Sequence, residues 1–419
     1  MNGPAVPGPT RLPYYGWIIV GVATLSYVLV FGTSMAAFGL FVHPVSAEFR
    51  LNRAQISTAL IFISIGNAAV APVLGWAADR FPARRIYLSC VVLFGLSMAI
   101  LSASASLLID AVVLGVMMPF GLLGAGSLTL SVLVARWFEA QRGRAMAIAG
   151  AGLYLGNILV TPLVGLVIQA AGWRLALLLI AAGVTALLGL FGLLIRDAAS
   201  PGHAAAVHAH GSPAAGHASI RQIVSAPQFW LIGIRAGLGF AIIQTVSVSL
   251  VTLGVETGLS IVQAASITSM IGGGSLAGAL LLAIFADRIR RVHLLTGVLA
   301  AAALLNAALH FLADYQAIMA AAATLGIVSG ILTPTVFTFV ADRFGAASFG
   351  TARGLTIPLT AVIQAGVVSF GSTVFDRSGS YTAMFDAFAV ALVLAAVMMF
   401  AVQFCRTTVA ADRPAWPAS

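Results

Sequence analysis

Arg235 is the side chain of this sequence best suited to bind a charged ligand. It lies in the apolar run FWLIGIRAGLGF, five residues after Trp230 and therefore roughly 7 to 8 Å further along a helix. A charged arginine inside a bilayer costs about 2.5 to 3.5 kcal/mol on insertion scales, so we expect it to face protein, water or a ligand. Its planar guanidinium suits a carboxylate, a sulfonate or a phosphate. The alternative, that Arg235 reaches lipid headgroups or makes a structural pair, stays open.

A second group of charged residues occurs twice, each time at the end of a long apolar run. The two copies are Asp79, Arg80, Arg84 and Arg85, and Asp287, Arg288, Arg290 and Arg291. Because the same junction returns in the second half of the chain, the sequence indicates a duplicated set of helices.

The composition explains why charge gathers in short junctions. The chain is 60% hydrophobic and 8% charged, with a mean hydropathy of +1.05, whereas a globular domain is about 45 to 50% apolar and about 25% charged. Apolar runs of roughly 20 residues match the thickness of a bilayer, and only helices or closed barrels satisfy their backbone groups there. The runs lack the alternation of barrel strands. We therefore predict an all-α membrane protein with twelve transmembrane helices, at 15–42, 53–78, 86–106, 108–135, 143–170, 174–196, 227–253, 261–286, 292–311, 314–341, 350–375 and 381–405.

The basic residues predict the orientation of these helices. All 21 are arginine, and sixteen of them fall in loops or tails on one side of the predicted membrane against four on the other. The positive-inside rule places both termini in the cytoplasm, and we expect a plasma membrane, of the bacterial inner-membrane type. The net charge of +9 is then explained by the arginines of the cytoplasmic loops and tails. It does not indicate a nucleic-acid partner, and we expect none.

A polar segment divides the chain into two similar halves. Residues 197–226 are rich in Ala, Gly, Ser, Pro and His, a composition that cannot bury a core. The halves share further features: Trp17 resembles Trp230, Gln55 resembles Gln263, and Arg142-Gly143 resembles Arg353-Gly354. The predicted parts are a tail at 1–14, a six-helix bundle at 15–196, a linker at 197–226, a second bundle at 227–405 and a tail at 406–419.

These features resemble the major facilitator superfamily of transporters across essentially the whole chain. The run from Gly75 to Arg80 with Arg84-Arg85 is similar to the signature of that superfamily between helices 2 and 3. Within it, the YYGW, ARWFEAQRGRAMAI, GWR and PQFW segments resemble the branch of monocarboxylate transporters and oxalate/formate antiporters. The resemblance implies two pseudo-symmetric six-helix bundles that expose a midplane site to alternate sides.

The resemblance also implies where the substrate site lies. Helices 1, 4, 7 and 10 of the superfamily line a central cavity, which with helices 5 and 11 brings several hydrogen-bonding side chains into consideration. The candidates besides Arg235 are Tyr27, Gln244, Thr245, Thr333, Thr335, Tyr154, Asn157 and Gln364. For each of them the alternative is an interhelical hydrogen bond, worth about 0.6 kcal/mol on average.

The duplicated junctions resemble the cytoplasmic latch of the superfamily. In that latch the carboxylate lies at the N-terminus of a neighbouring helix, and arginines pair with acids across the bundle. We therefore expect Asp79, Arg80, Arg84, Arg85, Asp287 and Arg288 to act in gating, which requires interactions that exist in one state only. The alternative is a permanent topology anchor. Two glycine pairs, Gly152 with Gly156 and Gly274 with Gly278, have spacings that allow close helix approach, so we expect them to act in packing. The resemblance implies that their two helices abut across the halves, where the glycines would let the bundles rock.

Two departures from the branch bear on the substrate. Relatives usually carry an arginine in helix 8 that meets the substrate carboxylate, and Ala279 stands there; a basic residue of helix 1 is replaced by His43. Asp110 and Asp386 fall near the outer ends of their helices, so no carboxylate is predicted at mid-bilayer. Coupling to a proton or counter-ion stays open.

Several functions are excluded by what the sequence lacks. GAGLYLG at 150–156 imitates a dinucleotide loop, but no strand precedes it. No nucleophile, base and orienting residue converge, and no phosphate-binding loop occurs, so we expect no enzyme and no cofactor. The histidines of the predicted linker have weak metal-binding spacing, and we expect no metal site.

We therefore expect a secondary active transporter, acting as a monomer in the lipid bilayer, that moves a small organic solute such as a carboxylate or other organic anion. The alternatives are efflux of amphipathic or neutral compounds and a receptor of the transporter fold that does not transport.

Overall fold

The protein is all-helical in the part of the chain that its structure, a computed structural model, describes. That part comprises residues 13–50, 53–197, 218–256, 261–309, 314–378 and 381–401, and no strand occurs in it. The all-α prediction is therefore confirmed. Most of the predicted linker, residues 1–12 of the predicted first tail and the whole predicted tail at 406–419 lie outside the described residues.

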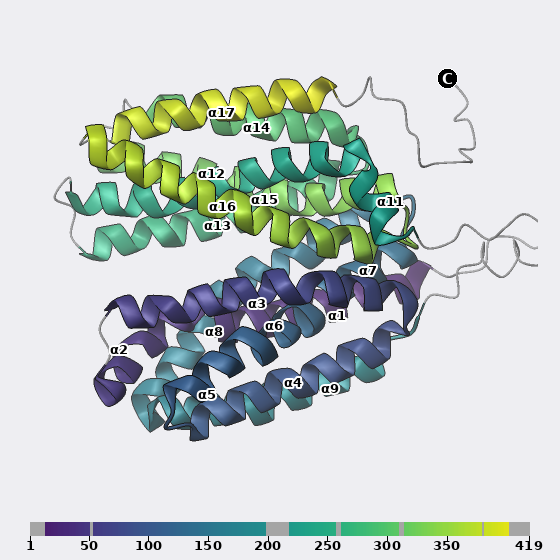
Figure 1. The fold of residues 1–419 in the computed structure, drawn as a ribbon, viewed down its shortest axis with the longest axis vertical. Coiled ribbons are helices and arrows are strands. Elements are labelled where there is room, and N and C mark those ends of the chain that lie inside the picture. Colours follow the sequence, from purple (N-terminus) through teal and green to yellow (C-terminus); the bar gives the residue numbers. More distant parts are fainter. Residues whose placement is uncertain are drawn as a thin grey trace, which may run out of the picture.

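The first half of the chain builds the lower group of helices in Figure 1. Its elements are α1 (Pro13–Phe31), η1 (Gly32–Ala36), α2 (Phe38–Phe49), α3 (Arg53–Arg80), α4 (Ala83–Ala103), α5 (Leu107–Val112), η2 (Val113–Met117), α6 (Met118–Phe120), η3 (Gly121–Ser127), α7 (Leu128–Trp137), α8 (Arg142–Leu179), η4 (Ile180–Val184) and α9 (Thr185–Leu193), where η denotes a π-helix.

The second half builds the upper group (Figure 1). Its elements are α11 (Ile220–Ser225), α12 (Pro227–Glu256), α13 (Ile261–Phe285), α14 (Arg291–Ala308), α15 (Tyr315–Phe344), α16 (Phe349–Ser378) and α17 (Tyr381–Ala401). Helix α11 falls inside the segment predicted as linker. It forms because Ser219 and Gln222 make a reciprocal capping box that satisfies two backbone N–H groups at its start.

Ten helices of the described residues are long and apolar enough to cross a membrane. One of them, Arg142–Leu193, consists of two helices that meet at a kink. The kink is at Gly172, whose backbone angles of φ 82° and ψ 164° are not helical. A shorter apolar helix, Ala383–Met399, follows near the end of the described chain. These helices follow the predicted order along the chain, and the number of twelve spans stays a prediction.

Three predicted spans are less regular than expected, and one of them, predicted at 174–196, passes through η4. The span predicted at 15–42 passes through η1 and continues as α2 to Phe49, and the span predicted at 108–135 alternates between α-helix and the π-helices η2 and η3. A π-helix adds one residue to a turn and so rotates the side chains that follow it. Hydrophobicity cannot reveal this change, because an apolar residue fits the lipid in either register.

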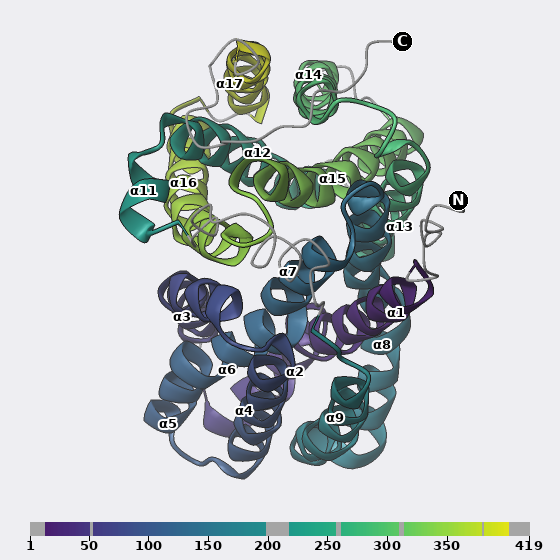
Figure 2. The ribbon, with the colours of Figure 1, turned by 90° about the vertical axis from the view of Figure 1, so that its right-hand side faces the viewer.

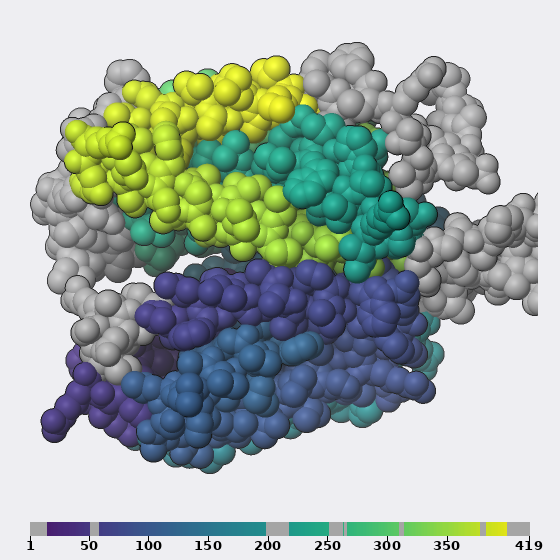
Figure 3. Space-filling view, in the orientation of Figure 1, coloured from purple at the N-terminus to yellow at the C-terminus, as the bar shows by residue number. Residues whose placement is uncertain are grey.

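The two groups of helices meet along two pairs of neighbours. Figure 2 shows the helices nearly end on, with α16 beside α3 and α13 beside α8. The two helices of each pair pack against each other. Figure 3 shows that the groups touch near α11 and that the surface is hollowed between them towards the opposite end. We call the touching end the latch end.

Glycines allow the closest approach between the halves. A Cβ atom on Gly75 of α3 would collide with the backbone carbonyl of Gly350 in α16, and one on Gly354 would collide with that of Ala71. Helices α8 and α13 pack against each other across the halves, as the resemblance implies, but their glycine pairs do not lie at that contact. Gly152 and Gly156 of α8 pack against α1 and the start of η1, and Gly274 and Gly278 of α13 pack against α15. Each pair therefore allows close helix packing within its own half.

Replacing Gly152 with alanine should lower the free energy of unfolding by about 1 to 3 kcal/mol, the usual cost of overpacking. The added methyl group would overlap the carbonyl oxygen of Thr24, which belongs to a helix backbone and cannot move aside. The measurement is the midpoint of thermal unfolding in detergent. Gly189→Ala is the matched control, since no atom lies within 4 Å of its added Cβ. Equal midpoints for the two variants would contradict the packing argument.

Candidate functional site

A cavity of about 500 Å³ lies between the two halves. Its walls come from α1, η1, α3, η3 and α8 of the first half and from α12, α15 and α16 of the second. Most of the wall is apolar. The polar or charged residues that line it are Tyr27, Ser64, Asn67, Ser127, Tyr154, Gln244, Ser329, Thr333, Arg353, Thr356, Thr360 and Gln364.

Helix α16 contributes a continuous stripe to this wall. The residues of the stripe are Arg353, Thr356, Ile357, Thr360, Ala361 and Gln364. Each of these residues lies three or four positions from another member of the stripe, the spacing that keeps side chains on one face of a helix. Four of the six can hydrogen-bond, so α16 presents a polar line to an otherwise apolar cavity.

Arg353 is the only charged residue among those that line the cavity in the described part of the chain. Its side chain is held in place from two sides: one guanidinium nitrogen donates to the Ser127 carbonyl at 2.7 Å, and the guanidinium carbon lies 3.7 Å from the ring centre of Phe337. The residue is only 3% exposed, and its Nε has no hydrogen-bond partner. Among the described residues no carboxylate forms an ion pair with it. A buried cation oriented in this way is suited to bind an anion.

The Ser127 carbonyl joins the two halves at this site. Besides Arg353 of α16 it accepts a hydrogen bond from the Tyr27 hydroxyl of α1 at 2.8 Å. Ser127 is the last residue of the π-helix η3, and π-helical turns inside α-helices occur frequently at functional sites. The backbone of the first half thus aims a side chain of the second half into the cavity.

Five of the predicted site residues line the cavity: Tyr27, Tyr154, Gln244, Thr333 and Gln364. Tyr154 also reaches across the halves, with its hydroxyl 3.4 Å from the carbonyl oxygen of Ser329. The polar residues Asn67, Thr356 and Thr360 were not among the predicted ones.

Four predicted site residues lie elsewhere. Thr245 donates to the carbonyl of Ala241 within its own helix, at 2.8 Å. Thr335 is buried and donates to the carbonyl of Ile331 within its own helix, at 2.7 Å. Asn157 is exposed and faces Gly272 of α13. Arg235 is 5% exposed but does not line the cavity.

The position of Arg235 on its helix explains why. The wall residues of α12 include Gly233, Ala236, Gly237 and Phe240, which form one helical face. Position 235 falls roughly 140° away from the centre of that face, at about 100° per residue. Depth along the helix was predicted from sequence, whereas the rotation of the helix was not.

Arg353 was missed because the two halves were aligned in the wrong register. The sequence comparison matched Arg353-Gly354 to Arg142-Gly143 and so placed Arg353 in a cytoplasmic loop. In the structure Gly350 occupies the place that matches Gly143, because each is bound by the aspartate of the opposite half. Arg353 therefore lies four residues, or about 6 Å, further along its helix than the sequence match implies. Stepping back from Gln364 by helical intervals through Thr360 and Thr356 would have found it.

Asp79 closes the latch end on one side. Its two carboxylate oxygens accept from the backbone N–H of Gly350 at 2.9 Å and from the N–H and the hydroxyl of Thr351, each at 2.7 Å. These groups belong to the first turn of α16, where unpaired N–H groups and the helix dipole favour a negative charge. The side chain of Asp79 is 1% exposed.

Asp287 makes the equivalent contact on the other side. Its carboxylate accepts from the backbone N–H of Gly143 at 2.9 Å and of Arg144 at 3.2 Å, at the start of α8. Arg291 forms an ion pair with Asp287 at 3.1 Å, and the side chain of Asp287 is 22% exposed. The two junctions thus join α3 to α16 and α13 to α8.

The arginines of the junctions are placed differently from what the resemblance implies. The exposed ones are Arg80, Arg84, Arg85, Arg288 and Arg290. Arg80 stacks on Trp76 with its guanidinium 4.6 Å from the ring centre. The ion pair that crosses between the halves is instead Arg142 with Asp342, at 2.7 Å. Asp342 also meets Arg291 at 3.4 Å, which connects this pair to the Asp287 junction.

No group of three or more metal-binding side chains occurs in the residues that the structure describes. The histidines of the predicted linker at positions 203, 208, 210 and 217 lie outside those residues.

Comparison with known proteins gives the same family in sequence and in structure. A sequence model of the Major Facilitator Superfamily matches residues 23–362. An uncharacterised MFS-type transporter of Escherichia coli, YhjX, is 27% identical over 361 residues, which are 80% of this chain and 83% of that protein. The multidrug resistance protein B homolog of Mycobacterium tuberculosis is 31% identical over 37% of this chain, a stretch that spans only 29% of that relative. The cis,cis-muconate transport protein of Acinetobacter baylyi is 29% identical over 39% of this chain and 40% of that protein.

Solved structures share the fold. The crystal structure of the transporter FucP in the outward conformation superimposes with a TM-score of 0.72 at 16% identity, covering 94% of this chain and 100% of that one. The human organic anion transporter MFSD10 gives a TM-score of 0.71 at 16% identity, with 93% and 100% covered. The sequence match over most of the chain and the shared fold confirm the resemblance: the chain belongs to the Major Facilitator Superfamily of membrane transporters.

Proposed function

We propose that this transporter moves a small organic anion, with a carboxylate as the binding group, by alternating access of its two halves. The observation that carries the proposal is Arg353, the one charged residue among those that line the central cavity in the described chain. A buried arginine without a carboxylate partner carries a desolvation cost that an anionic solute offsets. The cavity volume of about 500 Å³ falls within the range for small-molecule sites, roughly 300 to 1,000 Å³.

The residues around Arg353 suit the remainder of such a solute. Thr356, Thr360 and Gln364 continue from Arg353 along the same face of α16 and can hydrogen-bond to a second polar group. Gln244 and Tyr154 lie on other helices of the wall and could orient the solute from there. The apolar residues between them, such as Phe240 and Leu332, would cover its hydrocarbon part.

The duplicated junctions would act as the gate. The bonds of Asp79 and Asp287 to helix starts in the opposite half can exist only while the latch end is closed. We propose that this end faces the cytoplasm, as the arginine distribution predicts. Arg142 and Asp342 add an ion pair that must break when the halves separate there.

Efflux of an amphipathic or neutral compound is the second candidate. The largely apolar wall of the cavity favours it, and a multidrug resistance protein is among the relatives. Relatives named for anions, the cis,cis-muconate transport protein and a probable sulfoacetate transporter of Cupriavidus necator, favour the first candidate.

A paired screen separates the two candidates. The purified protein is heated with aliphatic and aromatic carboxylates and with the primary amide of each acid, because a ligand raises the unfolding temperature of the state that it binds. We expect stabilisation by a subset of the acids and by none of the amides. Equal stabilisation by an acid and its amide, or stabilisation by neutral or cationic amphiphiles alone, would contradict the anion assignment. Uptake of the stabilising acid into proteoliposomes then tests transport itself.

A further inference from the structure

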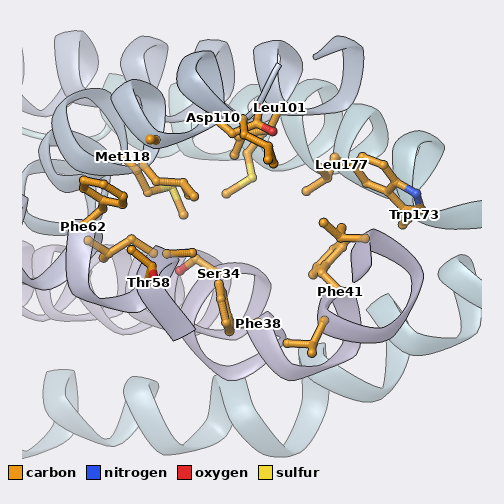
Figure 4. Close-up of a pocket in the computed structure, with 18 of the residues that line it drawn as sticks. Ser34, Phe38, Phe41, Thr58, Phe62, Leu101, Asp110, Met118, Trp173 and Leu177 are labelled. Carbon is orange, nitrogen blue, oxygen red and sulfur yellow. The ribbon is translucent and has the colours of Figure 1, made fainter. Parts of the chain in front are cut away.

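A second cavity, separate from the transport site, lies inside the first half near the end remote from the latch. It has a volume of about 260 Å³ and is enclosed by η1, α2, α3, α4, α5, η2, α6 and α8. Figure 4 shows that it is surrounded by aromatic and aliphatic side chains, with Phe38, Phe41, Phe62 and Trp173 around it and Met118 beside them. A cavity of this size holds a molecule a little smaller than the usual drug-sized ligand.

Asp110 is the only charged residue among those that line this cavity in the described chain. It belongs to the first turn of α5, and Figure 4 places it in the cavity wall near Leu101. Its Oδ1 is buried and has no hydrogen-bond partner. A carboxylate oxygen left in this condition is costly, and a proton or a cation would offset the cost.

The nearest basic residue is already occupied. Arg174 pairs with Glu48 at 2.7 Å and donates to the carbonyls of Ser102 and Ser104 at 2.6 and 2.9 Å. Glu48 also accepts from the Trp173 indole at 2.8 Å. Within the described residues Asp110 forms no ion pair. Asp110 has a hydrogen bond with the Ser104 hydroxyl and attracts the more distant charge of Arg174, but its Oδ1 on the cavity side is left for a ligand.

We propose that this cavity binds a small lipophilic amine in its protonated form, with the ammonium group at Asp110 and the hydrocarbon part among the aromatic rings. The carboxylate supplies the charged hydrogen-bond acceptor, and aromatic faces attract cations in addition to covering apolar surface. The hydroxyls of Ser34 and Thr58 also line the cavity and could accept from the same ammonium group. An anionic solute is disfavoured here by Asp110, so this site and the central cavity select opposite charges.

The site borders the transport pathway without belonging to it. Met35 of η1 lines both cavities, whereas Arg353 lines only the central one. The proposal is therefore independent of the function proposed for Arg353.

Binding of 2-phenylethylamine and of its neutral counterpart 2-phenylethanol tests the proposal. The two probes have nearly the same shape, and only the amine is charged at neutral pH. Isothermal titration of the purified protein should show at least about tenfold tighter binding of the amine, since a charge-assisted hydrogen bond is worth more than a neutral one. Quenching of Trp173 fluorescence, absent in Trp173→Phe, reports that the probe occupies this cavity.

Asp110→Asn preserves the size of the side chain and removes its charge. Asp110→Asn should lower the affinity for the amine by about tenfold or more and leave the affinity for the alcohol unchanged. Ala111→Phe, which fills the cavity while keeping the carboxylate, should abolish binding of both probes and also corrects for probe dissolved in detergent. Arg353→Gln should bind the amine as the unaltered protein does. Equal affinities for amine and alcohol, an amine preference that survives Asp110→Asn, or loss of amine binding in Arg353→Gln would each overturn the proposal.

Discussion

Replacing Arg353 with glutamine should abolish saturable uptake of the carboxylate substrate. Glutamine keeps hydrogen-bonding capacity and removes the charge, so the anion loses its one charged partner among the described residues that line the cavity. Truncating one member of a buried, hydrogen-bonded charge pair costs about 2 to 5 kcal/mol, or roughly 30- to 4,000-fold in affinity. The measurement is the concentration dependence of uptake into proteoliposomes, together with the thermal shift produced by the same acid.

The matched controls use the same substitution at other arginines. Arg221 lies exposed on α11, and Arg221→Gln should transport normally. Arg353→Lys keeps the charge but cannot both donate to Ser127 and present a planar fork to the solute, so we expect weaker, measurable uptake. Arg235→Gln tests the residue that the sequence favoured. If Arg235→Gln loses the acid-induced thermal shift while Arg353→Gln keeps it, the site assignment proposed here is wrong.

Replacing Asp79 with asparagine should shift the protein away from the state that is closed at the latch end. The variant retains one acceptor oxygen for the three donors on Gly350 and Thr351. A hydrogen bond to a charged group contributes about 1.5 to 3 kcal/mol, so the equilibrium between the two states should change roughly 10- to 150-fold. The measurement is the labelling rate of a cysteine at position 360, in the cavity wall, by a membrane-impermeant maleimide added from each side.

The second junction provides an internal comparison. Asp287→Asn should produce a smaller shift in the same direction, because the Asp287 side chain is 22% exposed against 1% for Asp79 and water can replace part of what is lost. Arg84→Gln and Arg85→Gln change exposed side chains and should label like the unaltered protein. Identical labelling from both sides in Asp79→Asn would show that the junction is a fixed anchor, and a large effect of Arg84→Gln would restore the role that the resemblance gave to that arginine.

The sequence by itself determined the class of the protein and the arrangement of its helices along the chain. A bilayer offers no partner for backbone N–H and C=O groups, so long apolar runs had to be helices, and their length had to match the membrane. The repeated Asp-Arg junction could be recognised in the sequence for a similar reason, since charge is tolerated only where the chain leaves the lipid. Tyr27, Tyr154, Gln244 and Gln364 were found because a polar group on an apolar helix is conspicuous whatever its neighbours are.

Only the tertiary structure decided which face of each helix meets the cavity. Lipid accepts an apolar side chain in any direction, so hydropathy carries no information on helix rotation, and the π-helical turns in η1, η2 and η3 change that rotation again. By sequence spacing Arg235 lies deeper in its predicted span, 227–253, than Arg353 does in 350–375, yet packing turns Arg353 into the cavity and Arg235 away from it. The partners that hold Arg353, the Ser127 carbonyl and the Phe337 ring, come from elements that are 226 and 16 residues away in the chain. The contact with Ser127 depends on how the two halves close on each other, which no local pattern records.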